Sequence, residues 1–170
     1  MLVDDVLNLF GKRVIKQSRA NLTRRKKNAS KSLYDSLKYK IEKKAYKYTL
    51  YFEMEDYGKF IDRGVKGVGG TKANGERWKV KKVTNNDFKY GNKKPPAKAF
   101  DKWIVRRGIA PRTAGGQFAS RRSTSFAIAN SVYHTGHETT NFFTRPLENE
   151  FNKLPNDLLK GFLGDIDLRL

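Results

Sequence analysis

A period-two alternation of apolar and polar residues between positions 37 and 54 constrains the fold more than any other feature. Leu37, Tyr39 and Ile41 alternate with charged residues, and a second run follows after Lys43–Ala45. The apolar positions of the second run are Tyr46, Tyr48, Leu50, Phe52 and Met54. Alternation at this period places one set of side chains on one face of a strand, and aromatic and β-branched residues suit such a surface. The pattern predicts a β-hairpin whose short connection is Lys43–Ala45.

Helical patterns surround this hairpin on both sides. Apolar residues recur at helical spacing from Val3 to about Arg25, with acidic residues at the start and basic residues at the end, as the helix dipole favours. A turn of helix is expected to reach Ser36, capped by Ser30 or Ser32. After the hairpin, a short helix is expected from Asp56, as its N-cap, to Arg63, with Gly64 as its C-cap.

The second half of the chain predicts three more helices and a strand. The first is expected over Pro96–Arg107 and the second over Ser123–Tyr133. A third, with Thr144 as its N-cap, should end or kink at Pro155 and continue through Leu158, Leu159 and Phe162. The candidate buried positions of the second are Phe126, Ile128, Ala129 and Val132. From Ile166 to Leu170, apolar and charged residues alternate again, which predicts a last strand that adds to the hairpin sheet.

Together these elements indicate the α+β class. We expect a single domain over 1–170, in which an N-terminal helix and C-terminal helices pack on a small antiparallel sheet made of the hairpin and the C-terminal strand. A glycine-rich, lysine-rich stretch without clear period predicts a basic, loop-rich insertion over 68–138. Loops of that length in a compact domain are usually functional or ordered by a partner.

The charge of the chain points to a polyanionic partner. It carries 36 Lys and Arg against 17 Asp and Glu, a formal charge of +19. Thirteen basic and two acidic residues lie in 12–44, and eighteen basic and four acidic in 59–122, whereas 134–170 has four basic and six acidic. Nucleic acid, an anionic membrane surface and an acidic protein are the candidate partners.

Eleven basic positions are candidates to face DNA, because lysine- and arginine-rich segments contact the phosphate backbone without reading sequence. They are Arg24, Arg25, Lys26, Lys27, Lys79, Lys81, Lys82, Arg106, Arg107, Arg121 and Arg122. Aromatic residues interleave with them over 78–90 and 100–118, which would allow base stacking, although core or interface roles are more common for such residues.

No arrangement of residues favours catalysis or a cofactor. The chain has no cysteine, and no run approaches the length of a membrane span, so we expect a soluble protein made inside the cell. His134 and His137 lack the spacing of a metal site, and we expect loop histidines. The glycines from Gly64 onward lack the order of a phosphate loop and predict a flexible loop. Glu53, Glu55 and Asp56 would suit a nuclease only with further carboxylates, so we expect neither enzyme activity nor metal.

Three segments in order resemble the tail-completion, or head–tail joining, proteins of tailed bacteriophages. The segments are 30–37 (Ser-Lys-Ser-Leu-Tyr-Asp-Ser-Leu), 56–64 (Asp-Tyr-Gly-Lys-Phe-Ile-Asp-Arg-Gly) and 141–148 (Asn-Phe-Phe-Thr-Arg-Pro-Leu-Glu). The motif positions are Ser32, Leu33, Tyr57, Phe60, Gly64, Phe143 and Pro146. The resemblance covers residues 1–67 and 139–170. The basic insertion between them is a departure from the family, and it resembles, more weakly, ring proteins in the neck of crAss-like phages.

The resemblance implies a structural virion protein in the neck, made in the bacterial cytoplasm, that forms a six- or twelve-fold ring of identical subunits. Its partners would be the portal or an adjacent neck or tail ring and the packaged double-stranded DNA, with no membrane contact. The residues alone leave a sequence-neutral nucleic-acid-binding protein as the alternative, and a nuclease as a third hypothesis that would need Glu53 or Glu55.

Overall fold

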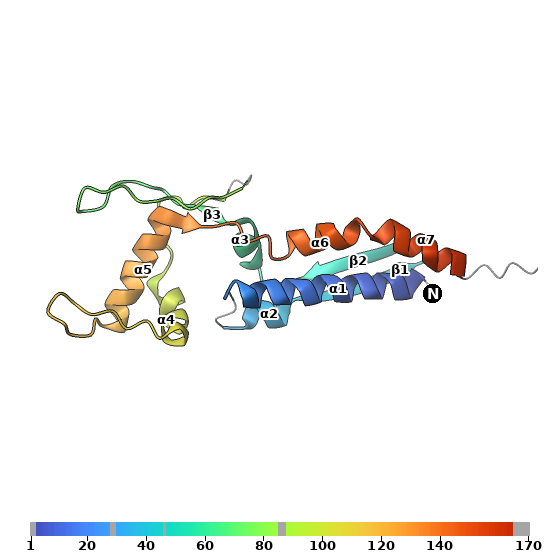
Figure 1. The fold of residues 1–170 in the computed structure, drawn as a ribbon, viewed down its shortest axis with the longest axis horizontal. Coiled ribbons are helices and arrows are strands. Elements are labelled where there is room, and N and C mark those ends of the chain that lie inside the picture. The colour runs from blue at the N-terminus through green and yellow to red at the C-terminus, as the bar shows by residue number, and fades with distance from the viewer. Residues whose placement is uncertain (1–2, 28–29, 46, 85–87, 165–170) are drawn as a thin grey trace, which may run out of the picture. The chain divides into compact units, whose positions relative to one another are not determined.

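The computed structural model describes residues 3–27, 30–45, 47–84 and 88–164, and these fold into two compact units. Residues 1–56 and 141–170 belong to the first unit, and residues 57–140 belong to the second. The expected insertion, 68–138, lies wholly inside the second unit, which also contains the helix expected after the hairpin. The fold class is α+β (Figure 1), as the sequence predicts.

The first unit contains two long helical segments and the hairpin. Its elements are α1 (Val3–Arg24), α2 (Ser32–Ser36), β1 (Lys38–Lys44), β2 (Lys47–Glu53), α6 (Thr144–Phe151) and α7 (Leu154–Gly164). Helix α1 lies beside α6 and α7, and the hairpin packs against this helical layer (Figure 1). The expected strand Ile166–Leu170 lies outside the described residues.

The hairpin register explains why the alternation in the sequence is so regular. Strand β1 pairs antiparallel with β2, so that Tyr39 lies opposite Phe52 and Ile41 opposite Leu50. The rings of Phe10 from α1 and Phe143, just before α6, make edge contacts with Phe52 at 6.2 Å and 5.3 Å. The apolar face of the hairpin therefore packs against both helical segments. The expected connection Lys43–Ala45 is wrong in its bounds, because Lys43 and Lys44 belong to the ladder, which continues to Lys44 opposite Lys47.

Gly11 lies in the middle of α1, where glycine normally weakens a helix. A Cβ built on Gly11 would lie 2.6 Å from Cδ2 of Tyr39. The glycine thus allows the hairpin to approach the helix closely, and the Tyr39 hydroxyl donates to Asn8 Oδ1 at 3.1 Å. Glycine is therefore favoured at this helix position, because only a residue without a Cβ leaves room for the Tyr39 ring.

The second unit is built around α5 (Arg121–Thr135). A 3₁₀ turn, η1 (Ala97–Phe100), leads into α4 (Asp101–Arg107), and both pack on α5. The remaining elements are α3 (Gly58–Arg63) and the two-residue strands β3 (Val65–Lys66) and β4 (Gly136–His137), which pair antiparallel. Ile104 and Ala129 are buried between α4 and α5, and Ser125 donates to the Asp101 carboxylate across the same contact.

Gly64 and Gly67, the first two glycines after α3, are closely packed, whereas a Cβ on Gly75 would meet nothing within 4 Å. Gly64 ends α3 with φ of +80°, as expected of a C-cap, and a Cβ on it would lie 2.7 Å from the His137 carbonyl oxygen. Gly67 and Gly136 leave no room for a Cβ against each other's backbone. Val68 and Gly69 then donate backbone bonds to the carbonyls at the end of α5. Here glycine allows two backbones to cross.

Several predicted helix ends are wrong by one or a few residues. Helix α2 begins after Lys31, α3 after Tyr57 and α6 after Phe143, each without a side-chain cap, so that the expected caps at Ser30 or Ser32, Asp56 and Thr144 do not form. The 96–107 helix begins as the 3₁₀ turn. Pro155 lies in the first turn of α7, where proline is tolerated, and the break comes before it, at Asn152 and Lys153. Phe126 is exposed rather than buried, and Thr124 and Ser125 are buried instead.

Candidate functional site: a basic groove and two basic loops

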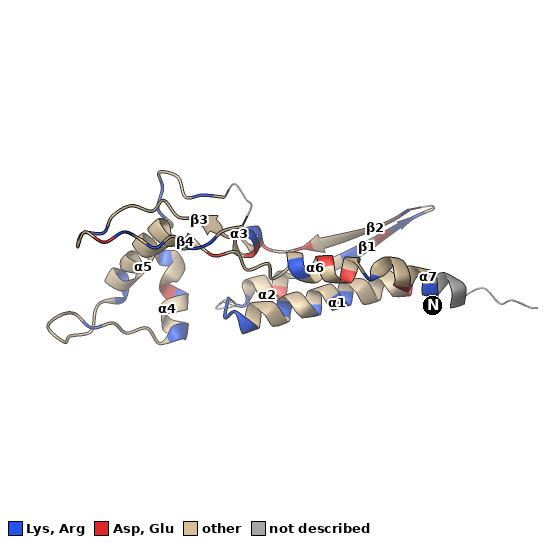
Figure 2. Cartoon of the chain, turned by 45° about the horizontal axis from the view of Figure 1, so that its top comes forward, with Lys and Arg blue, Asp and Glu red and all other residues tan. Residues whose placement is uncertain are grey.

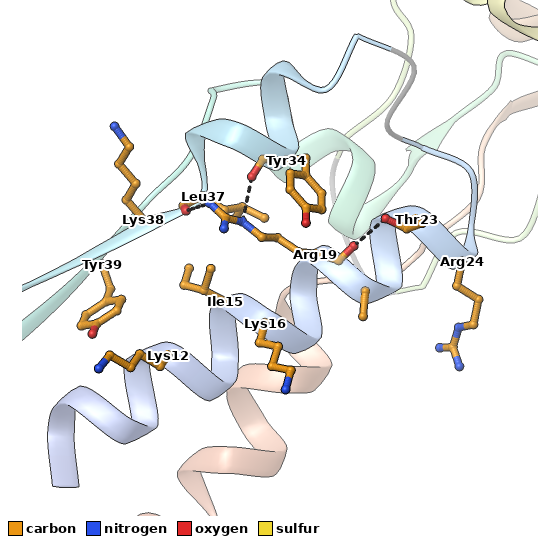
Figure 3. A pocket seen from close by; sticks show the side chains of 11 residues that line it. Lys12, Ile15, Lys16, Arg19, Thr23, Arg24, Tyr34, Leu37, Lys38 and Tyr39 are labelled. Carbon is orange, nitrogen blue, oxygen red and sulfur yellow. Dashed lines mark hydrogen bonds between the residues drawn. The ribbon is translucent and has the colours of Figure 1, made fainter. Parts of the chain in front are cut away.

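A groove of about 960 Å³ runs along one side of α1 in the first unit (Figure 3). Residues spaced three and four apart on α1 form one wall, and α2 and the start of β1 form the other. The lining residues are Lys12, Ile15, Lys16, Arg19, Ala20, Thr23, Arg24, Tyr34, Leu37, Lys38 and Tyr39. None of them is acidic, and its inner surface is mainly apolar.

The base of the groove is rigidly built. Leu37 is almost fully buried, as is Ile15. Arg19 donates from Nε to the Tyr34 carbonyl at 3.0 Å and from Nη2 to the Leu37 carbonyl at 3.1 Å, while its guanidinium lies 5.0 Å from the centre of the Tyr34 ring. Arg19 therefore ties α1 to the segment between α2 and β1. Its position is set by two chain carbonyls and a ring, so we assign it a structural role.

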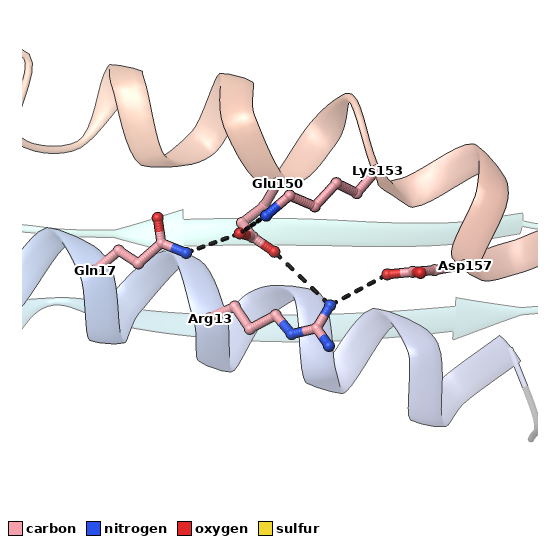
Figure 4. A network of polar contacts seen from close by, with 5 residues as sticks. All are labelled: Arg13, Gln17, Glu150, Lys153 and Asp157. Carbon is pink, nitrogen blue, oxygen red and sulfur yellow. Dashed lines mark hydrogen bonds and ion pairs between the residues drawn. The ribbon is translucent and has the colours of Figure 1, made fainter.

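The rim of the groove is positively charged. Lys12, Lys16, Arg24 and Lys38 all lie on it and are exposed. On a different side of α1, Arg13 and Gln17 contact acidic residues of α6 and α7 (Figure 4). The acidic residues that the C-terminal helices bring to α1 therefore compensate charge away from the groove, and the groove keeps its positive potential.

The polar contacts between α1 and the C-terminal helices centre on Glu150 of α6, whose side chain is 2% exposed. Its Oε1 accepts from Gln17 Nε2 and Lys153 Nζ, each at 2.7 Å, and Arg13 Nη1 lies 3.8 Å from Oε2. Burial by itself raises the pKa of this carboxyl, but the hydrogen bonds from Lys153 and Gln17 and the charges of Lys153 and Arg13 together outweigh it and lower the pKa. The ionised carboxylate of α6 thus binds Gln17 and Arg13 of α1 and stabilises the packing of the two helices.

Four of the predicted DNA-facing residues are consecutive at the end of α1, and one of them, Arg24, also lines the groove. Lys27 donates its backbone N–H to the Leu22 carbonyl and Lys26 donates to the Thr23 carbonyl, both at 2.9 Å, and Lys26 has φ of 54°. This is a Schellman ending with lysine in place of the usual glycine. Arg24 and Arg25 complete the basic end, which Figure 2 shows in blue.

The other seven candidates are distributed over the second unit. Lys79, Lys81 and Lys82 are exposed on the segment that runs past the end of α5, where Lys81 donates its backbone N–H to the Thr135 carbonyl. Arg106 and Arg107 are exposed at the end of α4. Arg121 and Arg122 are exposed in the first turn of α5, where the helix dipole disfavours positive charge. The candidates are therefore divided between the two units.

The second unit also presents two turns with the same hydrogen-bond pattern. In the first turn, the backbone N–H of Lys72 donates to the Glu76 carbonyl at 2.7 Å, and that of Gly75 donates to the Lys72 carbonyl. In the second turn, the backbone N–H of Thr113 donates to the Gln117 carbonyl, and that of Gly116 donates to the Thr113 carbonyl. Isolated bridges flank them, between Thr71 and Arg77 and between Arg112 and Phe118. The two turns share a short sequence pattern, Ala followed two residues later by Gly and then by Glu or Gln, which is too short to be recognised as a repeat from the sequence alone.

The aromatic residues near these turns are partly engaged within the chain. Trp78 stacks on His134 with centroids 5.1 Å apart and ring planes 3° apart, and Lys72 Nζ lies 5.5 Å from its ring. Phe118 is 65% exposed, and Arg112 lies 4.2 Å from its centroid. Trp78 therefore has one face covered by a protein ring, which leaves Phe118 as the better candidate for stacking.

The positions that carry the phage-protein resemblance have mostly structural surroundings. In the first unit Ser32 begins α2, Leu33 and Pro146 are buried, and Phe143 packs on Phe52. In the second unit Gly64 ends α3, whereas Tyr57 and Phe60 are each 39% exposed. Phe60 contacts Phe88 at 4.8 Å. The resemblance thus falls on residues that build the two units.

Neither histidine nor the acidic residues after β2 are assembled into a site among the described residues. His134 is held between Trp78 and the Gly69 carbonyl, which lies 2.6 Å from Nδ1. The part of the chain that is described contains no group of three His, Asp or Glu residues placed to hold a metal ion. Within the same residues, no helix combines the length and apolar character needed to cross a bilayer.

Comparison with known proteins identifies no relative. No family model matches the chain, and neither the curated proteins nor the solved structures include a significant match.

Proposed function

We propose that this chain is a non-enzymatic structural protein of a tailed-phage virion, one subunit of a ring in the head–tail neck. The observation that carries the proposal most directly is the placement of charge. The groove of the first unit is lined by basic residues and by no acidic one, while Glu150 and Asp157 join α1 to α6 and α7 on another side of the helix. Such a surface suits the phosphates of DNA that passes without being read.

The ordered motifs support the same proposal. Leu33, Phe143 and Pro146 come from two segments that are far apart in the sequence, and all three help to build the first unit. A six- or twelve-fold ring would stack on the portal or on an adjacent neck or tail ring. It would be made in the host cytoplasm and would line the channel with its basic surfaces.

The first test counts copies of the protein in purified phage particles by quantitative mass spectrometry. A count near six or twelve, or a small multiple of either, supports a neck ring. Absence from particles would remove the connector proposal and would favour the sequence-neutral nucleic-acid-binding protein.

A second test separates these two functions with the isolated subunit. The connector predicts weak binding to duplex DNA, whereas a stand-alone binder predicts micromolar or tighter binding that falls steeply with salt, by about 0.9 in the logarithmic slope for each phosphate neutralised. Replacing Lys79, Lys81 and Lys82 with Gln should reduce DNA retention in particles. The matched control replaces Lys44 and Lys47 at the hairpin end, which are also exposed.

A further inference from the structure

The groove on α1 has the features of a binding site for a peptide strand. The phosphates of a nucleic acid could contact the charged rim of the groove. They would not match the inner surface, which is mainly apolar and includes the half-buried rings of Tyr34 and Tyr39. A fitting occupant has apolar side chains on one face and negative charge on the other. Its volume of about 960 Å³ lies within the range of sites that enclose small ligands or short peptide segments.

The groove also passes the open edge of the hairpin. Lys38 and Tyr39 are consecutive residues of β1, whose side chains point to opposite faces, and both line the groove. Among the described residues β1 pairs with β2 alone. The groove therefore gives access to backbone groups of β1 that another strand could pair with, as in recognition by strand addition.

The chain itself contains a segment with the required chemistry. Residues 165–170, Asp-Ile-Asp-Leu-Arg-Leu, form the longest stretch outside the described residues. Apolar residues alternate there with charged ones, and the first two charges are negative. In an extended conformation Ile166, Leu168 and Leu170 would share one face, opposite Asp165 and Asp167. This pattern complements an apolar groove with Lys12, Lys16, Arg24 and Lys38 on its rim.

Geometry favours a second copy over the chain's own segment. Glu150 lies by Gln17 and Asp157 lies by Arg13, so α7 runs antiparallel to α1 and continues toward its N-terminus for about 10 Å after Asp157. The groove extends the other way, from Lys12 to Arg24, over about 18 Å. Six extended residues span only about 20 Å. Within one chain, the segment would need this length to turn back around α1 and would have too little left to lie along the groove.

We propose that the groove binds residues 165–170 of a second copy of this chain, as a strand added beside β1. The inference rests on the proposed ring of identical subunits, in which neighbouring copies would hold the segment and the groove at high local concentration. Each subunit would hold the C-terminal segment of one neighbour and offer its own to the next, a head-to-tail contact that can close into a ring.

Cysteine pairing tests this contact directly, because the chain has no cysteine of its own. Full-length Ala20→Cys is mixed with full-length Leu168→Cys and oxidised mildly, and the mixed disulfide is quantified on non-reducing gels and by peptide mass spectrometry. Ala20 is exposed within the groove, and Asn152→Cys, exposed at the end of α6, is the matched control. We expect several-fold more mixed disulfide with Ala20→Cys, falling as salt is raised from about 0.1 M to about 1 M.

Charge reversal then tests the rim. Lys12→Glu with Lys16→Glu in the Ala20→Cys chain should reduce the mixed disulfide to the control level, and Asp165→Lys with Asp167→Lys in the Leu168→Cys chain should restore it. A yield no greater than that of Asn152→Cys would overturn the proposal. A disulfide that forms only within single chains carrying both cysteines would also overturn it. The same holds if duplex DNA protects the groove cysteine from alkylation and the Leu168→Cys chain does not.

The two proposals can fail separately. Copy number in particles tests the neck ring and is independent of the groove. A trans disulfide in purified protein supports the groove contact even if particles lack the protein. If particles contain the expected copy number but Ala20→Cys forms no more mixed disulfide than the control, the ring proposal stands and the groove contact between subunits is overturned.

Discussion

Replacing Glu150 gives the sharpest test of how the first unit is held together. At neutral pH the carboxylate is ionised, 2% exposed and bonded to Gln17 and Lys153 at 2.7 Å. Lys153 and Arg13 are 59% and 42% exposed, so solvent limits each of these ion pairs to roughly 0.2–1 kcal/mol. The Gln17 bond to a charged acceptor contributes about 1.5 kcal/mol.

These contributions give different costs for two substitutions. Glu150→Ala should lower the free energy of unfolding of the first unit by about 2–3 kcal/mol, because all of the bonds are lost. Glu150→Gln keeps an acceptor oxygen and loses the charge, so it should cost about 1 kcal/mol. Glu148→Gln, on the exposed side of the same helix, is the control and should change stability by less than about 0.5 kcal/mol.

The pH dependence of the Glu150→Gln effect has a definite sign. The native pKa of Glu150 lies below its ordinary value of 4.5, so the ionised group stabilises the folded state above that pH. The stabilisation is lost as pH falls through the lower native pKa. The difference between Glu150→Gln and the parent should therefore be full at pH 7 and should shrink as the pH falls below 4.5 and through the native pKa.

Amide hydrogen exchange measured by mass spectrometry suits this prediction, because Trp78 and Trp103 both lie in the second unit and tryptophan fluorescence would miss the first. Exchange of the α1 and α6 amides should speed up in Glu150→Ala. Unchanged exchange in both helices at pH 7, or an effect of Glu150→Gln that grows toward acid, would refute the reasoning.

Three further predictions concern backbone and helix ends. Gly11→Ala should destabilise the first unit by about 1–3 kcal/mol in urea unfolding, because its Cβ would lie 2.6 Å from the Tyr39 ring, and Tyr39→Leu should remove much of that cost. Lys26→Gly should stabilise by about 1 kcal/mol in the same assay, because φ of 54° suits glycine; unchanged stability would contradict the Schellman ending. Arg121→Glu and Arg122→Glu should each raise the melting temperature slightly, through about 0.3–1 kcal/mol of dipole energy, while weakening any DNA association.

The sequence predicts the first unit well because its signals are local and periodic. The 37–54 alternation needed only period-two geometry, and the Phe52 contacts follow from its facing the helices. The stripe on α1 predicted Val3–Arg24 to within a residue. Caps were predicted less well, because a polar side chain near a helix start, such as Ser32 or Thr144, carries no information on whether the backbone will turn there or a residue earlier.

The second unit was harder to predict because backbone contacts between distant segments hold much of it. Val68 donates to the Tyr133 carbonyl, Lys81 to that of Thr135 and Thr140 to that of Asp62. Backbone bonds leave no periodic trace in the side chains, so the stretch from Val68 onward reads as an unpatterned loop. Its glycines gave the one available signal, since Gly67 and Gly136 are needed where two backbones cross, but glycine predicts flexibility and close packing equally well.

The groove was missed for a related reason, since its walls come from separate parts of the first unit. Lys12, Lys16 and Arg24 were visible as a basic helix face, and Lys38 as the polar side of a strand, but only the folded chain places them around one apolar trough. The C-terminal alternation was recognised and assigned to the hairpin sheet. Residues 166–170 lie outside the described part of the chain, so the structure leaves that assignment untested. What it adds is that β1, paired with β2 alone among the described residues, lines the basic groove, and that α7 runs antiparallel to α1; our proposal of a strand from a second copy combines these two observations.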